Sequence, residues 1–128
     1  MQTYDKTLAA HFGEILERRE AELRGILRAS DELVEQAQST PAHEVLDFKD
    51  IASEESQANV DEVKADHAAH EFEQVLAARR RLQDGGYGAC LDCEEPIDLR
   101  RLNALPATPY CAACQAIRER AYATAARR

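Results

Sequence analysis

The sequence contains no Trp, and only 5% of its 128 residues are aromatic. With 45% hydrophobic residues in all, it offers little material for a large globular core, and an elongated helical fold is favoured over a compact sandwich. No run approaches the ~20 consecutive apolar residues that a membrane span needs. The N-terminal stretch MQTYDKTLAAHFGEILERRE has neither the basic start nor the apolar core of a signal sequence. We therefore expect a cytoplasmic protein that does not contact the membrane.

Basic residues are also scarce relative to acidic ones: 16 Lys and Arg against 24 Asp and Glu, a formal net charge of −8. An acidic chain is repelled by phosphate, so we expect no DNA binding through a broad basic face, and no direct sequence-specific DNA binding. The partner should be a protein. The acidity belongs to the N-terminal part, because residues 1–70 carry 16 acidic and 7 basic side chains and residues 71–128 carry 8 and 9.

Two long helices are predicted before the cysteines. From Tyr4 to about Gln38 there is no Pro, and Ala, Leu, Glu and Arg, which favour helices, dominate. Pro41 should end this helix, and helical character resumes near Ser53 until Gly85. Apolar residues recur at mostly three- and four-residue steps, which predicts that each helix has a partner. They are Leu8, Phe12, Ile15, Leu23, Ile26, Leu33 and Ala37, then Val60, Val63, Phe72, Val75, Leu76 and Leu82.

The four cysteines form two CxxC pairs, Cys90 with Cys93 and Cys111 with Cys114, separated by seventeen residues. This spacing predicts one structural zinc, because each pair supplies two thiolates from a tight turn and the two pairs complete a tetrahedron. Two disulfides in a secreted protein are an alternative that the missing signal sequence disfavours. A redox CxxC normally occurs once, beside a βαβ pattern that this sequence lacks. Four thiolates leave no open coordination position, so we expect no enzyme activity at this metal.

These patterns predict a mainly α fold with two parts. Residues 1–84 should form a long antiparallel coiled-coil hairpin with an acidic tip near 44–56, because a short connection favours antiparallel neighbours. Residues 85–128 should form a small four-cysteine zinc-finger module followed by a C-terminal helix.

Two details of the second part are open in the sequence. Glu94 follows Cys93 at a place where the turn tends towards positive φ, so we expect a somewhat strained first cysteine turn. The C-terminal helix could pack on the zinc module through Ile117 and Tyr122, or it could present a basic surface. That surface would consist of Arg118, Arg120, Arg127 and Arg128.

The flanking residues extend the cysteine pattern into a family resemblance. A helical hairpin followed by YGxCxxC, a seventeen-residue span and CxxC resembles the DnaK suppressor (DksA/TraR) family of bacterial transcription regulators. The matching residues around the cysteines are Tyr87, Gly88, Pro96, Ile97, Arg100, Arg101, Leu102, Ala104 and Pro106. A second match is the family's tip motif Asp-x-x-Asp-x-Ala, which reads here from Asp47 through Asp50 to Ala52.

The resemblance implies a regulator that enters the secondary channel of RNA polymerase and presents Asp47, Asp50 and Ala52 near the active centre, altering transcription initiation within the stringent response. Asp is also favoured at helix caps and turns, so either aspartate could serve a structural role. In the family, guanosine tetraphosphate is held by basic residues, and His67, Gln74 and Gln115 stand at the matching positions. We therefore expect weak or absent binding of this nucleotide.

Two other functions fit parts of the pattern. A transcript-cleavage factor of the Gre type would use the tip carboxylates to bind a second Mg²⁺ and promote RNA hydrolysis by polymerase. Such factors resemble this chain in the hairpin but lack the four-cysteine module. A zinc-module adaptor that binds some other protein through the hairpin is the third hypothesis.

Overall fold

The computed structural model describes residues 1–39 and 48–126, with side chains described over 1–33 and 62–124. Within these ranges a 3-10 helix at Lys6–Leu8 is followed by α1 at Ala9–Ser39 and α2 at Phe48–Asp84. Two shorter helices follow, α3 at Leu99–Ala104 and α4 at Ala112–Ala126. The described residues contain no strand, only two isolated antiparallel bridges, Thr3 with Asp98 and Ala89 with Pro96. The prediction of a mainly α fold is confirmed.

The long helices end close to the predicted places, but their starts differ, because the predicted start at Tyr4 is followed by the 3-10 helix and α1 begins only at Ala9. α1 ends at Ser39, as Thr40 and Pro41 predict, and α2 ends at Asp84, directly before Gly85. Gly85 has a φ of 89°, a conformation that L side chains rarely adopt, so the helix stops there. However, α2 begins at Phe48, five residues before the predicted start at Ser53.

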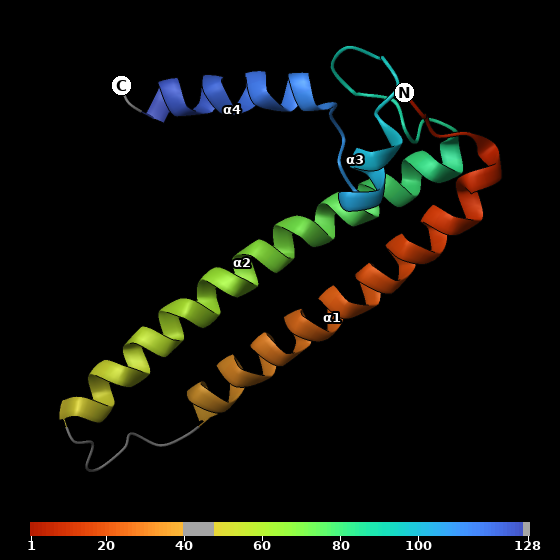
Figure 1. Cartoon of the computed structure of the whole chain (residues 1–128). Helices are drawn as coiled ribbons and strands as arrows, with labels where there is room; N and C mark the ends of the chain where they lie inside the picture. The colour runs from red at the N-terminus through yellow and green to blue at the C-terminus, as the bar shows by residue number, and fades with distance from the viewer. Residues whose placement is uncertain (40–47, 127–128) are drawn as a thin grey trace. The chain divides into compact units, whose positions relative to one another are not determined.

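The chain divides into two compact units. Unit 1 comprises residues 1–19 and 74–128, and unit 2 comprises residues 20–73. In each unit a segment of α1 lies beside a segment of α2 that runs in the opposite direction (Figure 1). α1 and α2 therefore contribute to both units, whereas α3, α4 and all four cysteines belong to unit 1.

Unit 1 has a core built from the start of α1, the end of α2 and the cysteine module. Tyr4, Phe12 and Tyr87 form an aromatic cluster, with ring centroids 4.9 Å apart for Tyr4 and Tyr87 and 5.5 Å apart for Phe12 and Tyr87. Gly13 of α1 faces Leu82 of α2 closely enough that an added Cβ would lie 3.5 Å from Leu82 Cδ2. The other buried apolar residues of the unit are Leu16, Val75, Ala78, Cys90, Ile97 and Leu102.

In the described part of unit 2, the two helices meet through a few apolar and charged side chains. Leu23 of α1 and Ala68 of α2 are buried, and the Arg24 guanidinium lies 5.4 Å from the centre of the Phe72 ring. Glu20 is only 6% exposed and accepts a 2.8 Å hydrogen bond from Arg24. A buried carboxylate is tolerated where such a partner offsets its lost hydration.

Several predicted seam residues are not buried. Ile26 and Leu33 of α1 and Val63 of α2 are exposed, while Leu16, which the predicted stripe omitted, is buried. Two of the three buried apolar residues in the described part of α2, Ala68 and Ala78, are small, and Val75 is the third. Small side chains at these positions let the helices approach closely, so fewer large residues are needed between them.

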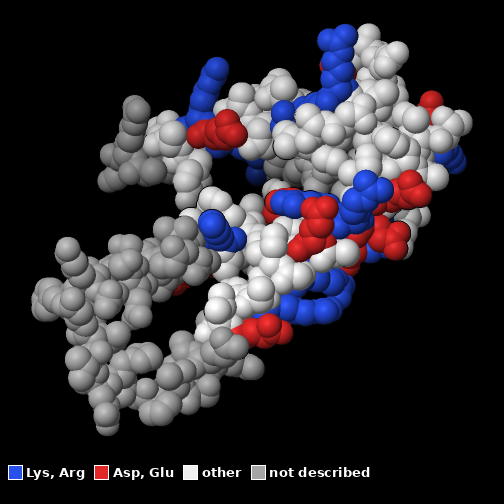
Figure 2. Space-filling model, turned by 60° about the horizontal axis from the view of Figure 1, so that its bottom comes forward, with Lys and Arg blue, Asp and Glu red and all other residues white. Residues whose placement is uncertain are grey.

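The described part of the chain has no helix long and apolar enough to span a membrane. On the face of the molecule shown in Figure 2, Lys and Arg side chains are interspersed with Asp and Glu side chains. The described residues on this face therefore form no broad patch of one charge sign.

Candidate metal centre

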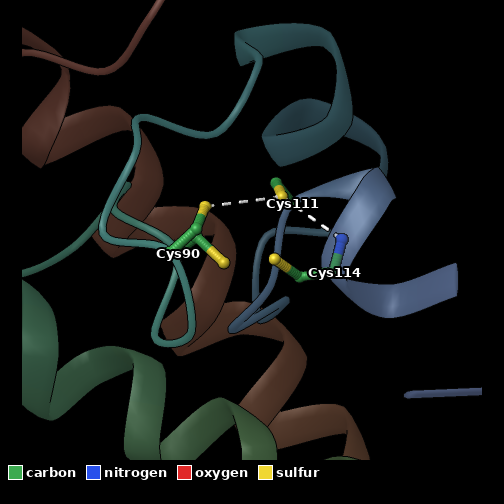
Figure 3. Close-up of side chains that lie close together, drawn as sticks. Cys90, Cys111 and Cys114 are labelled. Carbon is green, nitrogen blue, oxygen red and sulfur yellow. Dashed lines mark hydrogen bonds between the residues drawn. The ribbon is translucent and has the colours of Figure 1, made fainter. Parts of the chain in front are cut away.

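The four predicted cysteines meet at one point of unit 1. Cys90 and Cys93 lie in the turns after α2, Cys111 directly precedes α4, and Cys114 lies in the first turn of α4. Their four Sγ atoms all lie within 4.8 Å of one another, and those of Cys93 and Cys111 are 3.9 Å apart. Figure 3 shows the sulfurs of Cys90, Cys111 and Cys114 gathered in one space.

This geometry fits a tetrahedral zinc ion. With Zn–S bonds of ~2.3 Å, tetrahedral sulfurs lie roughly 3.8 Å apart, close to the distance between Cys93 and Cys111. Thiolate is a preferred ligand of Zn²⁺, and four of them make a closed, structural site. All four thiols are free of disulfide bonds. The arrangement therefore fits the predicted zinc and not the alternative of two disulfides.

Backbone hydrogen bonds shape the first cysteine turn. Cys90 N–H donates to Glu95 O at 2.9 Å, and Ile97 N–H donates to Gly88 O at 2.8 Å. Glu94 N–H donates to Cys90 O at 3.0 Å, which closes the turn, and Glu94 has a φ of 64°. Among the described residues other than glycine, Glu94 alone has a positive φ, so the expected strain in this turn is confirmed.

The thiols differ in how easily they lose a proton. Burial opposes ionisation of Cys90, but backbone hydrogen bonds from Cys93, Cys111 and Asp92 prevail and lower its pKa to about 6. The pKa of Cys114 is raised to about 12, mainly by its interaction with Cys111 and also by burial and the other sulfurs. The Cys90 thiolate therefore forms readily, whereas ionisation of Cys114 would place a second negative charge beside it and is opposed. A bound cation would compensate this repulsion and favour the cluster with all four thiols deprotonated.

Side chains fix the loop between the two pairs by binding its carbonyl groups. The Tyr87 hydroxyl donates to Pro106 O at 2.7 Å, and burial raises the pKa of this phenol. Arg101 Nε, on α3, donates to Tyr110 O at 3.0 Å. Tyr110 directly precedes Cys111, so these contacts set the position of the second pair. In the sequence Tyr87 and Arg101 stand out only as matches to a family pattern, and no sequence pattern predicts α3.

The structure contradicts one of the two alternatives for the C-terminal helix and bears on one residue of the other, Arg118. Ile117 and Tyr122 are 62% and 81% exposed, so the expectation that they pack α4 on the zinc module is wrong. Arg118 is not available as a simple basic surface either, because its guanidinium binds Asp92 with hydrogen bonds of 2.6 and 2.7 Å. It also lies 4.2 Å from the centre of the Tyr110 ring. No sequence pattern predicts the pairing of Arg118 with Asp92.

The predicted tip is largely beyond what the structure describes. Asp47 lies outside the described residues. Asp50 and Ala52 lie in the first turns of α2 and not in a loop between helices, and their side chains are outside the described set. The partner-binding role of these three residues therefore stays a prediction.

Comparison with known proteins links this site to a family. Residues 84–120 match the family described as the prokaryotic dksA/traR C4-type zinc finger. The RNA polymerase-binding transcription factor DksA of Haemophilus influenzae is 31% identical over 103 residues, which cover 75% of this chain and 71% of that protein. The protein of the same name from Caulobacter vibrioides is 34% identical over 95 residues, which cover 74% of this chain and 66% of that protein.

The fold agrees with a solved structure as well. Transcription factor DksA2 from Pseudomonas aeruginosa matches with a TM-score of 0.73 and 24% identity, over 92% of this chain and 88% of that one. The four converging thiols together with the C4 zinc-finger match indicate one structural zinc. On the extent and identity of these matches, the chain belongs to the DksA/TraR family.

Proposed function

We propose that this chain is a noncatalytic transcription regulator that binds RNA polymerase through its secondary channel and modulates initiation. The observation that carries the proposal is 31% identity to a relative named as an RNA polymerase-binding transcription factor, across 71% of that protein. The cysteine cluster at the end of α2 supports it, because the same region matches the family's zinc finger.

In this proposal the acidic tip acts on the polymerase. Asp47, Asp50 and Ala52 match the family's tip motif, and the sequence around them carries further acidic residues. Two carboxylates brought near a centre lined by cationic side chains and Mg²⁺ would be attracted strongly, because poor solvation there weakens screening. That attraction would alter the lifetime of promoter complexes.

We further propose that Cys90, Cys93, Cys111 and Cys114 are the zinc ligands. Bound zinc would hold a module too small to be stable alone. A closed four-thiolate site leaves no position for substrate, so we expect no catalysis at the metal.

Weak or absent binding of guanosine tetraphosphate belongs to the same proposal. Gln115 donates a 3.1 Å hydrogen bond to Glu119, so a carboxylate lies beside one of the positions that are basic in better-known members of the family. A polyanion would be repelled by that carboxylate. Titration with the nucleotide should show little uptake, and tight, salt-sensitive binding would contradict this expectation.

The tip is tested by comparing two double variants of equal charge. Asp47→Asn with Asp50→Asn should leave polymerase binding, measured by co-purification, largely intact and abolish the effect on initiation in a purified transcription assay. Glu54→Gln with Glu55→Gln removes the same charge nearby and should keep both activities. Unchanged regulation by the aspartate variant would refute the role of the tip.

The same preparation separates the other hypotheses. Stalled, backtracked elongation complexes should keep their full-length transcripts when the protein is added, and shortened transcripts would support a cleavage factor instead. Failure to co-purify with polymerase would favour an adaptor for another protein.

A further inference from the structure

Arg118 contacts one residue beside each cysteine pair. Its Nε and one terminal nitrogen donate to the two carboxylate oxygens of Asp92, at 2.6 and 2.7 Å. Asp92 lies inside the first CxxC, between Cys90 and Cys93. The same guanidinium lies over the Tyr110 ring, directly before Cys111. We call this set of three residues, Arg118 with Asp92 and Tyr110, the Arg118 bridge.

Helix geometry explains how one residue reaches both pairs. Arg118 follows Cys114 by four residues, so the two side chains lie on the same face of α4, one turn apart. The first turn of α4 thus contributes a thiol to the cluster, and the second turn contributes a cation that extends to the opposite pair. The bridge spans 26 residues of sequence between Arg118 and Asp92.

The bridge uses the strongest pairing available to a surface arginine. A two-pronged contact with a carboxylate is shorter and more directional than a single ion pair, and stacking on an aromatic ring adds to it. Because the Arg118 and Asp92 side chains are 52% and 33% exposed, solvent weakens the charge attraction. The bridge joins the turn that carries Cys90 and Cys93 to the helix that carries Cys114, so it restrains the motion of one cysteine pair relative to the other.

Little else ties α4 to the rest of unit 1. Its first turn is joined locally, by bonds from the backbone of Cys114 and Gln115 to Cys111. Beyond that turn, the hydrogen bonds and ion pairs that link α4 to another element of the described chain are those of Arg118. Ile117 and Tyr122 are exposed and do not anchor the helix.

We propose that Arg118 is a positioning residue that fixes the direction of α4 on the cysteine module and slows the loss of zinc from it. The proposal rests on the metal centre and is independent of polymerase binding. Through the Arg118 bridge, the direction of α4 depends on the first CxxC turn, so loosening that turn would release the helix.

The rate of zinc release tests whether Arg118 slows the loss of zinc. Each full-length, zinc-loaded variant is mixed with a coloured chelator and the rate of zinc transfer is followed. Arg118→Gln and Asp92→Asn should each release zinc roughly three- to tenfold faster than wild type, below the usual effect of buried outer-shell partners because this pair is partly exposed. Arg118→Lys should release zinc at a rate between those of wild type and Arg118→Gln, because lysine keeps the charge but loses the two-pronged bond. Arg120→Gln, an exposed arginine on the same helix, should release zinc at the wild-type rate.

Residual dipolar couplings test whether Arg118 fixes the direction of α4. In wild type, amides of α3 and of residues 112–118 should fit one alignment tensor, and in Arg118→Gln the α4 couplings should no longer fit it. The charge-swapped double variant Asp92→Arg with Arg118→Asp should recover part of the zinc retention that each single change loses. Equal zinc release and a shared tensor in Arg118→Gln would overturn the proposal. A wild-type protein purified without zinc would instead refute the metal centre on which it rests.

Discussion

Glu94 is held in a conformation that suits glycine. Its φ of 64° costs an L residue roughly 1–2 kcal/mol, and glycine would avoid that cost while losing roughly 0.5–1 kcal/mol in chain entropy. Glu94→Gly should therefore raise the free energy of unfolding of the zinc-loaded protein by about 0.5–1 kcal/mol, measured from urea midpoints.

The neighbouring residue supplies the control for this prediction. Glu95 has no positive φ, so Glu95→Gly carries only the entropic cost and should lower stability. If both substitutions destabilised the protein equally, Glu94 would not be strained.

Gly88 is required for two separate reasons. Its φ is 89°, and a Cβ there would lie 2.7 Å from the Cβ of Tyr4. Gly88→Ala should therefore destabilise unit 1 by about 2–5 kcal/mol, the sum of about 1–2 kcal/mol of backbone strain and about 1–3 kcal/mol of overpacking. Gly85 has the same φ but open space around it, so Gly85→Ala should lose only about 1–2 kcal/mol. Tyr4→Gly removes the Cβ that the added methyl group would meet, so in a double-mutant cycle followed by urea unfolding Gly88→Ala should cost less beside Gly at position 4 than beside Tyr4. An unchanged cost would contradict the contact with Tyr4.

At the scale of elements, α1 carries two glycines that its helix does not need. A Cβ at Gly13 would make an ordinary 3.5 Å contact with Leu82, and a Cβ at Gly25 would meet nothing within 4 Å. Each change to Ala should stabilise the protein by roughly 0.5–1 kcal/mol through helix propensity alone, seen as a higher urea midpoint. Ala21→Gly, at an exposed position of α1, should lose a similar amount. Destabilisation by Gly13→Ala would mean that Leu82 cannot accommodate the added methyl group.

The elements were predictable where local chemistry decides them. Pro41 and Gly85 marked the ends of α1 and α2 correctly, because proline and glycine act on the backbone itself. The buried seam was harder to predict. Leu16 and Glu20 are buried, while Ile26 is exposed, because burial depends on which side of α1 faces α2. That choice is a property of the helix pair, and each helix alone signals it only in part: the apolar stripes predicted Phe12, Leu23 and Val75 correctly.

At the scale of the molecule, the metal site also has features that the sequence predicts and features that it does not. Thiolate spacing identified all four converging cysteines, because CxxC turns bring ligands together locally and zinc limits how the pairs can meet. The pairing of Arg118 with Asp92 had no such signal, since 26 residues separate them and many other charges could have paired. The positive φ of Glu94 was predictable because a single turn determines it.

Removal of zinc should change amide hydrogen exchange in unit 1 much more than in unit 2. The buried residues Tyr87, Ile97 and Leu102 surround the cysteine module in unit 1, whereas the buried Leu23 and Ala68 of unit 2 belong to residues 20–73. Without metal, the four thiols lose the ion that holds them together and the module should open. Amide hydrogen exchange should then accelerate over residues 85–111, and the near-ultraviolet circular dichroism of the tyrosines should fall.

Exchange over residues 20–33 and 62–73 should change much less after chelation, because their helix contacts do not involve the cysteines. Adding zinc back should restore the slow exchange of residues 85–111, which controls for irreversible thiol oxidation. Equal acceleration in both ranges would show that the units unfold as one, so that the metal supports the whole helix pair. Unchanged exchange near the cysteines would show instead that the module is stable without metal, because its hydrogen bonds from Tyr87 and Arg101 to loop carbonyls then suffice.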